Sequence, residues 1–192
     1  MIVDELYNLE ESSGYSLEGS FTPDLVFSKL WLLKELSKIT DHVSTMYVLG
    51  SWYGNLAILI ARFQSLDVDQ IVNVETNKEF LSTSKKLLSQ FGADNVEYML
   101  KDANDIDYRQ LGQEGVVVNT SLTDMSGQDW FDNIPTGTLV VLQARDHDPG
   151  EQFAEPEDIE QKFPFDQVLY LGSLALEDPE TDYHRFMVIG IK

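Results

Sequence analysis

The feature that most constrains the fold is an alternation of short apolar runs with longer amphipathic segments along most of the chain. The apolar runs predict strands at residues 46–49, 71–75, 96–100, 115–119 and 138–143. Apolar residues at helical spacing predict helices at residues 21–40, 55–63 and 77–92, with a short one at 129–133. Strands that alternate with helices need crossover connections, which place helices on both faces of a parallel sheet. We therefore expect an α/β fold with three layers, α/β/α.

The end of the chain departs from this alternation. Its last apolar runs, 165–171 and 186–191, are separated by an acidic turn at 177–182. Two strands joined by a short polar turn favour antiparallel pairing, so we expect a mostly parallel sheet with an antiparallel C-terminal strand pair. A second acidic segment, 151–160, also contains a proline. We expect both acidic segments to be solvent-exposed loops.

The length of 192 residues and the lack of an internal repeat indicate one domain spanning residues 1–192. Within it, we distinguish an N-terminal helical cap, residues 1–45, from a sheet-forming core, residues 46–192. Thr22, which precedes a proline, is the predicted N-cap of the first helix, and Asn77 is the predicted N-cap of the long amphipathic helix.

The composition of the chain indicates the cellular compartment in which the protein is expected. No apolar run approaches the roughly 18 residues that a membrane span needs. The first residues, MIVDELYNLEE, are acidic where a secretory signal peptide is basic. The chain has no cysteine, which excludes disulfides, thiolate metal ligands and a cysteine nucleophile. We therefore expect a cytoplasmic protein that does not associate with membranes.

The chain is strongly acidic, with 13 basic against 33 acidic residues and a formal net charge of −20. Such a charge repels nucleic acid, so we expect no direct nucleic-acid binding. Two explanations of the charge remain open: an acidic surface without a specific partner, or a field that attracts a cationic substrate. The sequence does not predict an oligomeric state.

A glycine turn follows the first predicted strand, in the stretch MYVLGSWYGNLAIL, where Gly50 and Gly54 flank a tryptophan. Ligands of open parallel sheets bind beyond the carboxyl ends of the strands, so polar residues that follow strands are candidates. Glu75 follows the second strand, Asp102 follows the third, and Asn119 ends the fourth. Polar groups at four successive strand ends indicate a ligand site, although each alone is also explained by turn, cap or helix-terminus chemistry.

These residue types suit a nucleoside. A carboxylate at Glu75 can accept hydrogen bonds from ribose hydroxyls, and Asp102 can accept from an exocyclic amine such as that of adenine. A dinucleotide and S-adenosylmethionine both fit this logic. The dinucleotide fingerprint is G-x-G-x-x-G, whereas this chain has G-x-x-x-G, so we expect S-adenosylmethionine rather than NAD.

The segments YVLGSWYG, IVNVET and LKDAND resemble the class I S-adenosylmethionine-dependent methyltransferases, which have a Rossmann-like fold. In that family the first strand ends in a G-x-G-x-G turn, the second in an acid, and an aspartate follows the third. The resemblance implies that the glycine turn holds the methionine moiety, Glu75 the ribose and Asp102 the adenine amine, with Asn119 facing the transferable methyl. The cofactor-binding positions that it implies are Gly50, Ser51, Trp52, Gly54, Glu75, Thr76, Asp102, Ala103 and Asn119. It also implies that the N-terminal helix lies as a lid or edge helix near the cofactor.

Two positions depart from the family pattern. Trp52 replaces the middle glycine, and Val48 stands where an acid is usual two residues before the first glycine. The indole of Trp52 could stack on the ligand, or it could fill the cleft. An open cleft that reaches Glu75, Asp102 and Asn119 is the expected arrangement.

Candidate catalytic residues follow the fourth and fifth strands. Asn119 could accept from an acceptor amine or hydroxyl, and Asp124 could act as a base. His147 is the third candidate, because a flanking acid can orient and activate an imidazole. Three histidines without a His-x-x-x-His pair predict no metal site.

The function that we predict is methyl transfer from S-adenosylmethionine to a small molecule, a sugar or a protein side chain. The loop NTSLTDMSGQDW differs from the Asn-Pro-Pro-aromatic loop of amino-directed adenine methyltransferases, which argues against nucleobase chemistry. The alternative is a non-catalytic or differently reacting nucleoside-binding protein on the same fold.

Overall fold

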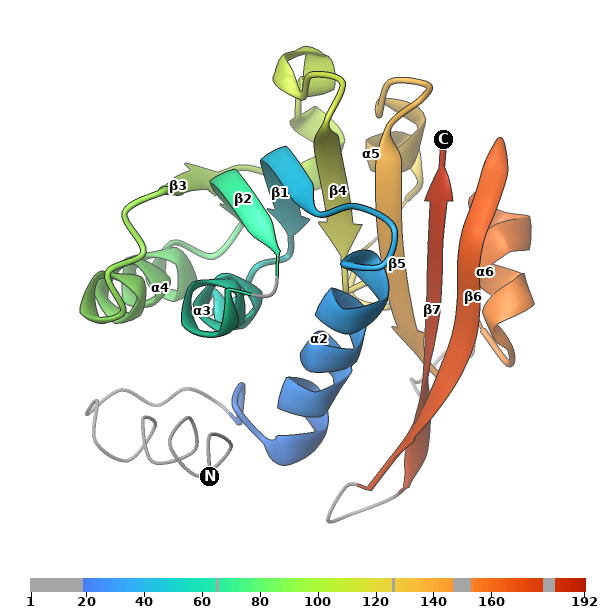
Figure 1. Cartoon of the computed structure of the whole chain (residues 1–192), viewed down its shortest axis with the longest axis horizontal. Helices are drawn as coiled ribbons and strands as arrows, with labels where there is room; N and C mark the ends of the chain where they lie inside the picture. Colours follow the sequence, from blue (N-terminus) through green and yellow to red (C-terminus); the bar gives the residue numbers. More distant parts are fainter. Residues whose placement is uncertain (1–18, 65, 126, 147–152, 178–181) are drawn as a thin grey trace.

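The computed structural model describes residues 19–64, 66–125, 127–146, 153–177 and 182–192 (Figure 1). Within these residues, seven strands form one sheet with the order β3-β2-β1-β4-β5-β7-β6. The strands are β1 (His42–Leu49), β2 (Asp67–Glu75), β3 (Val96–Leu100), β4 (Gly115–Asn119), β5 (Leu139–Arg145), β6 (Gln167–Leu176) and β7 (Tyr183–Ile191). Strand β7 runs antiparallel to both β5 and β6, and the other neighbours are parallel. The expected α/β sheet and its antiparallel C-terminal pair are confirmed.

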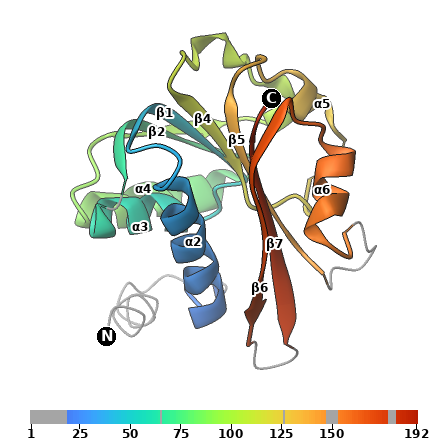
Figure 2. The same cartoon turned by 45° about the vertical axis from the view of Figure 1, so that its right-hand side comes forward.

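Helices cover both faces of the sheet, which gives the expected three layers (Figures 1 and 2). They are α2 (Pro23–Leu36), α3 (Asn55–Phe63), α4 (Lys78–Gln90), α5 (Asp129–Asp132) and α6 (Pro156–Lys162), with short 3-10 turns η1 (Ala103–Asp105) and η2 (Tyr108–Gln110). Alternate residues of each strand enter two separate hydrophobic clusters, as the period of a strand requires. One cluster joins the sheet to α2, α3 and α4, and the other joins it to α5 and α6.

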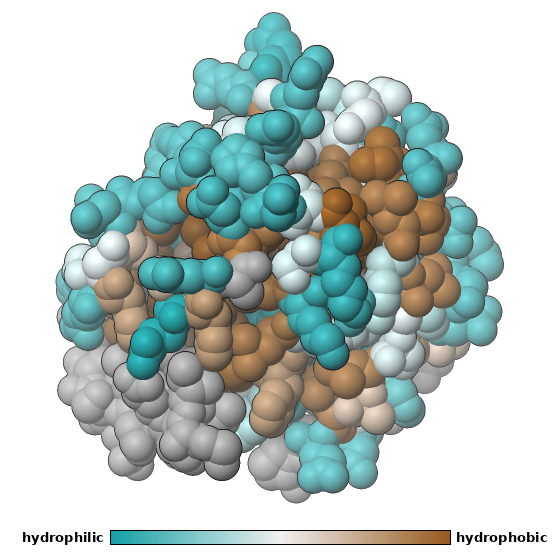
Figure 3. Space-filling model, in the orientation of Figure 1, coloured by the Kyte–Doolittle hydropathy of each residue, from teal (hydrophilic) through white to brown (hydrophobic). Residues whose placement is uncertain are grey.

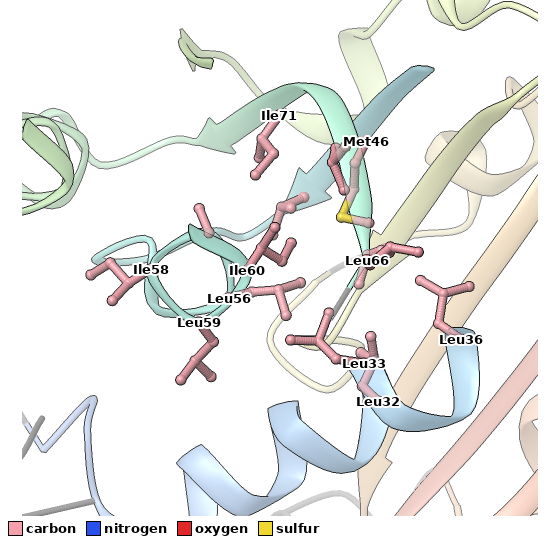
Figure 4. Packing of buried hydrophobic residues seen from close by; sticks show 14 of the residues in the cluster. Leu32, Leu33, Leu36, Met46, Leu56, Ile58, Leu59, Ile60, Leu66 and Ile71 are labelled. Atoms are coloured by element: carbon pink, nitrogen blue, oxygen red, sulfur yellow. The ribbon is translucent and has the colours of Figure 1, made fainter. Parts of the chain in front are cut away.

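The first cluster fixes the position of α2. Its residues Leu32, Leu33 and Leu36 are fully buried against α3 and β1, as Figure 4 shows beside Leu56 and Met46. Burying a leucine side chain stabilises a fold by about 1.5–3 kcal/mol, so this contact is substantial. The opposite side of α2 is less covered. Figure 3 shows apolar side chains over α2 and the neighbouring β6, where the two elements line a groove.

Several strands are longer than their apolar runs predict, among them β1 and β2. β1 begins at His42 rather than residue 46, and β2 begins at Asp67 rather than residue 71. The added residues pair with each other in the parallel ladder, His42 opposite Asp67 and Val43 opposite Val68. Backbone pairing therefore continues past the buried part of the sheet. The residues there are partly polar, so they lack the apolar pattern from which a strand is predicted.

The expectation of a loop at 151–160 is wrong for its second half, which forms the helix α6. Pro156 occupies the first turn, and the backbone N–H groups of Ala154 and Glu155 both donate to the Asp158 carboxylate. Ile159 is fully buried in the second hydrophobic cluster. The acidic residues thus form a helix N-terminus, where negative charge is favourable, and one apolar residue anchors it.

The two predicted N-caps are confirmed in position. The side chain of Asn77 accepts from the N–H groups of Glu79 and Phe80, whereas Thr22 occupies the N-cap of α2 without a side-chain capping bond. The other acidic segment, 177–182, lies mostly outside the described residues. None of the helices in the described ranges is long and apolar enough to cross a membrane.

Candidate functional site

A cavity of about 500 Å³ lies beyond the carboxyl ends of the strands β1 to β4. Its walls come from the segments that directly follow these four strands, together with the first turn of α4. The lining residues are Gly50, Trp52, Val74, Glu75, Thr76, Phe80, Lys101, Asp102, Ala103, Asn104, Ser121, Asp124 and Met125. Because parallel strands end at one edge of the sheet, segments far apart in sequence converge there.

Most of the predicted site residues line this cavity, but three of those in the described ranges do not. Ser51, Gly54 and Asn119 are absent from its walls. His147 lies outside the described residues. The lining also includes residues that sequence reasoning did not single out, of which Lys101 carries a charge. Its signal in the sequence is its place directly after β3, beside Asp102.

The two glycines of the turn serve different contacts. Gly50 has a φ of +61°, and a Cβ there would lie 3.1 Å from the Oγ of Ser121, so glycine lets the turn approach the loop after β4. Gly54 has a φ of +77°, and a Cβ there would lie 2.3 Å from the Oγ of Ser84 on α4. Close packing between the start of α3 and α4 therefore requires the second glycine, independently of any ligand.

Trp52 also has a left-handed backbone, with a φ of +51°. Its N–H donates to Oε2 of Glu75 at 2.9 Å, which links the turn to the end of β2. The indole packs against the rings of Tyr53 and Phe80, at centroid distances of 5.4 and 6.4 Å. Trp52 thus forms one wall, and the cavity beside it extends to Glu75 and Asp102.

The carboxylate of Glu75 organises the protein as well as the cavity. Oε1 accepts from the backbone N–H groups of Thr76 and Asn77 at 2.8 and 2.9 Å, and Oε2 accepts from Trp52. A carboxylate offers about four acceptor positions, two on each oxygen. Three are used by these backbone donors, and the Thr76 hydroxyl adds a longer contact to Oε1 at 3.4 Å, which leaves one position on Oε2 for a ligand.

Asp102 caps the turn η1 and borders the cavity. Its Oδ1 accepts from the backbone N–H and the side-chain amide of Asn104, both at 2.9 Å. Its Oδ2 accepts no hydrogen bond from the described part of the chain. The side chain is exposed and already oriented, so Oδ2 is an available acceptor at the cavity wall.

Asn119 shapes the loop after β4 rather than the cavity surface. The residue is fully buried, its Oδ1 accepts from the N–H of Ser121 at 2.9 Å, and its Nδ2 donates to Sδ of Met125 at 3.1 Å. Ser121 in turn donates to the carbonyl of Gly50 at 3.5 Å. These contacts turn Ser121, Asp124 and Met125 toward the cavity.

The charges around the cavity are unbalanced. Glu75, Asp102 and Asp124 contribute three carboxylates, and Lys101 contributes one ammonium group. A cleft with excess negative charge favours a cationic ligand. Within the described ranges, no three His, Asp or Glu side chains are placed so that they could hold one metal ion.

Comparisons with known proteins identify the fold of the chain. A scan against protein-family models and a search of curated protein sequences both find no match. The chain is similar to the solved structure of magnesium protoporphyrin IX methyltransferase from Synechocystis PCC 6803 with bound SAM, with a TM-score of 0.64 and 9% identity over 98% of this chain and 96% of that one. It is also similar to an rRNA methylase from Streptococcus thermophilus, with a TM-score of 0.57 and 15% identity over 84% and 95% of the two chains. The chain therefore has the Rossmann-like fold of class I S-adenosylmethionine-dependent methyltransferases.

Proposed function

We propose that the protein binds S-adenosylmethionine in the cavity after β1 to β4 and transfers its methyl group to a second substrate. The observation that carries this proposal is the pair of carboxylates at the ends of adjacent strands, Glu75 and Asp102, which both line the same cavity. The similar methyltransferase from Synechocystis carries SAM, and another similar structure with a TM-score of 0.57, TrmK from M. capricolum, carries the cofactor product S-adenosylhomocysteine. The cavity volume falls in the range of small-molecule sites, roughly 300–1,000 Å³.

The chemistry of the lining fits the nucleoside part of the cofactor. Oε2 of Glu75 has room for one ribose hydroxyl, because its other acceptor positions hold backbone donors. Oδ2 of Asp102 is the acceptor for the adenine amine. The rings of Trp52 and Phe80 offer apolar surface for the flat base or the ribose.

The charge of the lining fits the sulfonium. S-adenosylmethionine supplies a methyl group on a positively charged sulfur, and three carboxylates against one ammonium stabilise such a cation. Asp124 is the catalytic candidate that borders the cavity, and we propose that it accepts a proton from the acceptor group. Asn119 would act as a positioning residue, because both of its polar atoms hold the loop.

A second candidate function is cofactor binding without methyl transfer. One observation favours it: Asn119 does not line the cavity, and both polar atoms of its carboxamide bond within its own loop. The two candidates share the cofactor site, so they differ only in whether a methyl acceptor reacts.

For the acceptor, we propose a small molecule, a sugar or a protein side chain rather than nucleic acid. An rRNA methylase shares the fold, so the fold does not decide this point. The net charge of −20 argues against nucleic acid as the acceptor, because a polyanion would be repelled over most of the surface.

Ligand-induced stabilisation tests the cofactor proposal. A ligand at about a hundred times its dissociation constant raises the unfolding free energy by roughly 2.7 kcal/mol, so S-adenosylmethionine and S-adenosylhomocysteine should raise the melting temperature and NAD should not. Asp102→Asn removes the charge of the adenine acceptor and should weaken binding about tenfold, since a hydrogen bond to a charged group contributes about 1.5–3 kcal/mol.

Asp105→Asn is the matched control, because Asp105 is an exposed acid in the same 3-10 turn outside the cavity wall. It should bind the cofactor as the parent protein does. Melting curves that respond to NAD and not to S-adenosylmethionine would overturn the proposal.

A further inference from the structure

A groove of about 1140 Å³ lies between α2 and the last residues of β6, in the region of apolar side chains that Figure 3 shows. It shares no lining residue with the candidate cofactor cavity, so the two are separate features of the molecule. Its helical wall is a stripe at helical spacing, Phe27, Leu30, Trp31 and Lys34, which share one face of α2. The opposite wall is formed by residues 174–176 of β6.

The groove exposes apolar surface that a folded chain normally buries. Phe27 is 51% exposed, although burying such a side chain completely stabilises a fold by about 1.5–3 kcal/mol. Next to it, the Nε1–H of Trp31 donates to the Tyr170 hydroxyl at 3.2 Å, which holds the indole in place along the groove. Apolar surface that is hollowed and bordered by charges is typical of an interaction site.

One end of the groove is acidic. Leu176 and Tyr183 form the last pair of the β6–β7 ladder, and Glu177 and Asp182 continue from this pair. Both carboxylates are exposed, and neither forms an ion pair with a residue in the described ranges. Like charges at neighbouring positions of a ladder repel each other, so a cation at this end would be stabilised by both.

The other charges in the groove limit where a cation can lie. Asp24 lies at the acidic end, but its Oδ2 already accepts a hydrogen bond from the Tyr183 hydroxyl at 2.6 Å. The exposed Lys34 lies at the opposite end of the stripe. It is eleven residues along α2 from Pro23, a distance of about 16 Å at the helical rise of 1.5 Å per residue. The apolar part of the groove is therefore short and has a charged group at each end.

These charges distinguish between the possible occupants. Residues 1–18, which precede α2 in the chain, carry five acidic and no basic side chains, and the whole chain has a net charge of −20. Neither that segment nor a second copy of the chain complements the acidic end of the groove. The short apolar length between charged ends suits a small molecule rather than a continuous protein surface.

We propose that this groove is a second ligand site that binds a small apolar amine. The apolar body of the ligand lies against Phe27, Trp31 and the end of β6, and its ammonium group lies at Glu177 and Asp182. Because Lys34 lies at the opposite end, the ligand carries its positive charge at one end only. The proposal goes beyond the proposed function, because it needs neither S-adenosylmethionine nor methyl transfer.

Isothermal titration calorimetry on the full chain tests the apolar and the charged contributions separately. The probe is decylammonium, below the concentration at which it forms micelles. Decanoate has the same chain with the opposite charge, and propylammonium has the same charge with little apolar surface. Decylammonium should bind, decanoate should bind at least about fivefold more weakly, and propylammonium should show no measurable binding.

Two variants each remove one contribution. Phe27→Ser should weaken decylammonium binding about tenfold, because the groove loses its exposed ring. Glu177→Gln should weaken it about two- to fivefold, the contribution of an exposed ion pair. Both side chains are exposed, so the melting temperatures without probe should stay close to that of the parent protein.

The matched controls change the same kinds of residue outside the groove. Leu100→Ser replaces an apolar side chain that is 52% exposed, and Glu160→Gln replaces an exposed acid on α6. Both variants should bind decylammonium as the parent protein does.

Tryptophan fluorescence locates the bound probe. Trp31 lines the groove, whereas Trp52 lines the cofactor cavity and Trp130 is buried in the core. Decylammonium should change the emission of the parent protein. Trp31→Phe should lose most of this change, while calorimetry still detects binding.

Several results would overturn the proposal: no binding of decylammonium, equal affinity for decylammonium and decanoate, or unchanged binding in Phe27→Ser. An emission change that persists in Trp31→Phe would also overturn it, because the probe would then lie elsewhere. The cofactor is absent from these measurements, so their outcome is independent of the proposed function.

Discussion

At the scale of single residues, Glu75 joins two tasks in one carboxylate. It ends β2, borders the cavity, and accepts from three backbone N–H groups at the starts of two different connections. Glu75 is therefore a candidate ligand contact and also part of the hydrogen-bonded structure that forms the cavity wall. Its substitution should change the protein before any ligand is added.

We predict that Glu75→Gln lowers the unfolding free energy by roughly 1–3 kcal/mol, because the NH2 group of glutamine cannot accept from a backbone donor, whereas both oxygens of Glu75 do. Binding of S-adenosylmethionine should weaken as well. Urea unfolding with and without ligand measures both effects. Glu97→Gln, at an exposed position on β3, should change the unfolding free energy by less than about 0.5 kcal/mol. A Glu75→Gln protein as stable as the parent would contradict the structural role.

At the scale of elements, the packing of α3 against α4 depends on the absence of a side chain at Gly54. We predict that Gly54→Ala destabilises the fold by at least about 2 kcal/mol, because the new Cβ would overlap Ser84 and the backbone is left-handed. Gly92→Ala provides the matched comparison, since Gly92 is also left-handed but has no atom within 4 Å of the added Cβ. Gly92→Ala should lower the unfolding free energy only by the backbone strain, about 1–2 kcal/mol. Equal losses in denaturant unfolding would refute the packing explanation.

The first strand is tied to its neighbours by a pH-sensitive contact. His42, at the start of β1, lies 3.3 Å from Asp69 on β2 and 3.2 Å from Glu114 just before β4. The pKa of His42 is raised, mainly by its hydrogen bond to Asp69; burial opposes this, and the charges of Asp69, Glu114 and Asp67 add to the increase. The charged imidazole is thus favoured in the folded state.

We predict that this contact stabilises the fold below the ordinary histidine pKa of about 6.5 and that the contribution is lost as pH rises through the raised pKa. The free energy of unfolding should therefore fall over this window, and His42→Gln should flatten that part of the profile. High salt should reduce the slope in the parent protein, because the pair is exposed. An unchanged slope in His42→Gln would assign the pH dependence to other groups.

At the scale of the whole molecule, charge is distributed so that cations are either buried or dispersed. The only adjacent basic pair in the sequence, Lys85 and Lys86, lies exposed on α4. Lys29 and Arg185 are buried, so they present no broad basic surface. We predict that the purified protein does not retain DNA or RNA at physiological salt, as filter binding would measure. Sub-micromolar affinity would contradict this and favour a nucleic-acid methyltransferase.

The sequence by itself determined the order and type of most elements and the placement of polar groups after strands. Local patterns carry this information, because a buried strand must be apolar and a residue that follows a parallel strand must lie at the carboxyl edge. Trp52, Glu75, Asp102 and Asp124 could therefore be predicted to meet at one cavity. The polar starts of β1 and β2, and the helix α6, could not, because their pairing partners and their single anchoring contacts lie elsewhere in the chain.

Only the tertiary structure decided what individual side chains in the turn and loop do. Gly54 is required by the approach of α4, and Asn119 is turned into its own loop, although both stand where the sequence suggested ligand contacts. The groove between α2 and β6 joins two segments that carry no common motif. The physical reason is that side-chain direction and the charge of the surroundings depend on which elements pack together, and packing is set by contacts between residues distant in sequence.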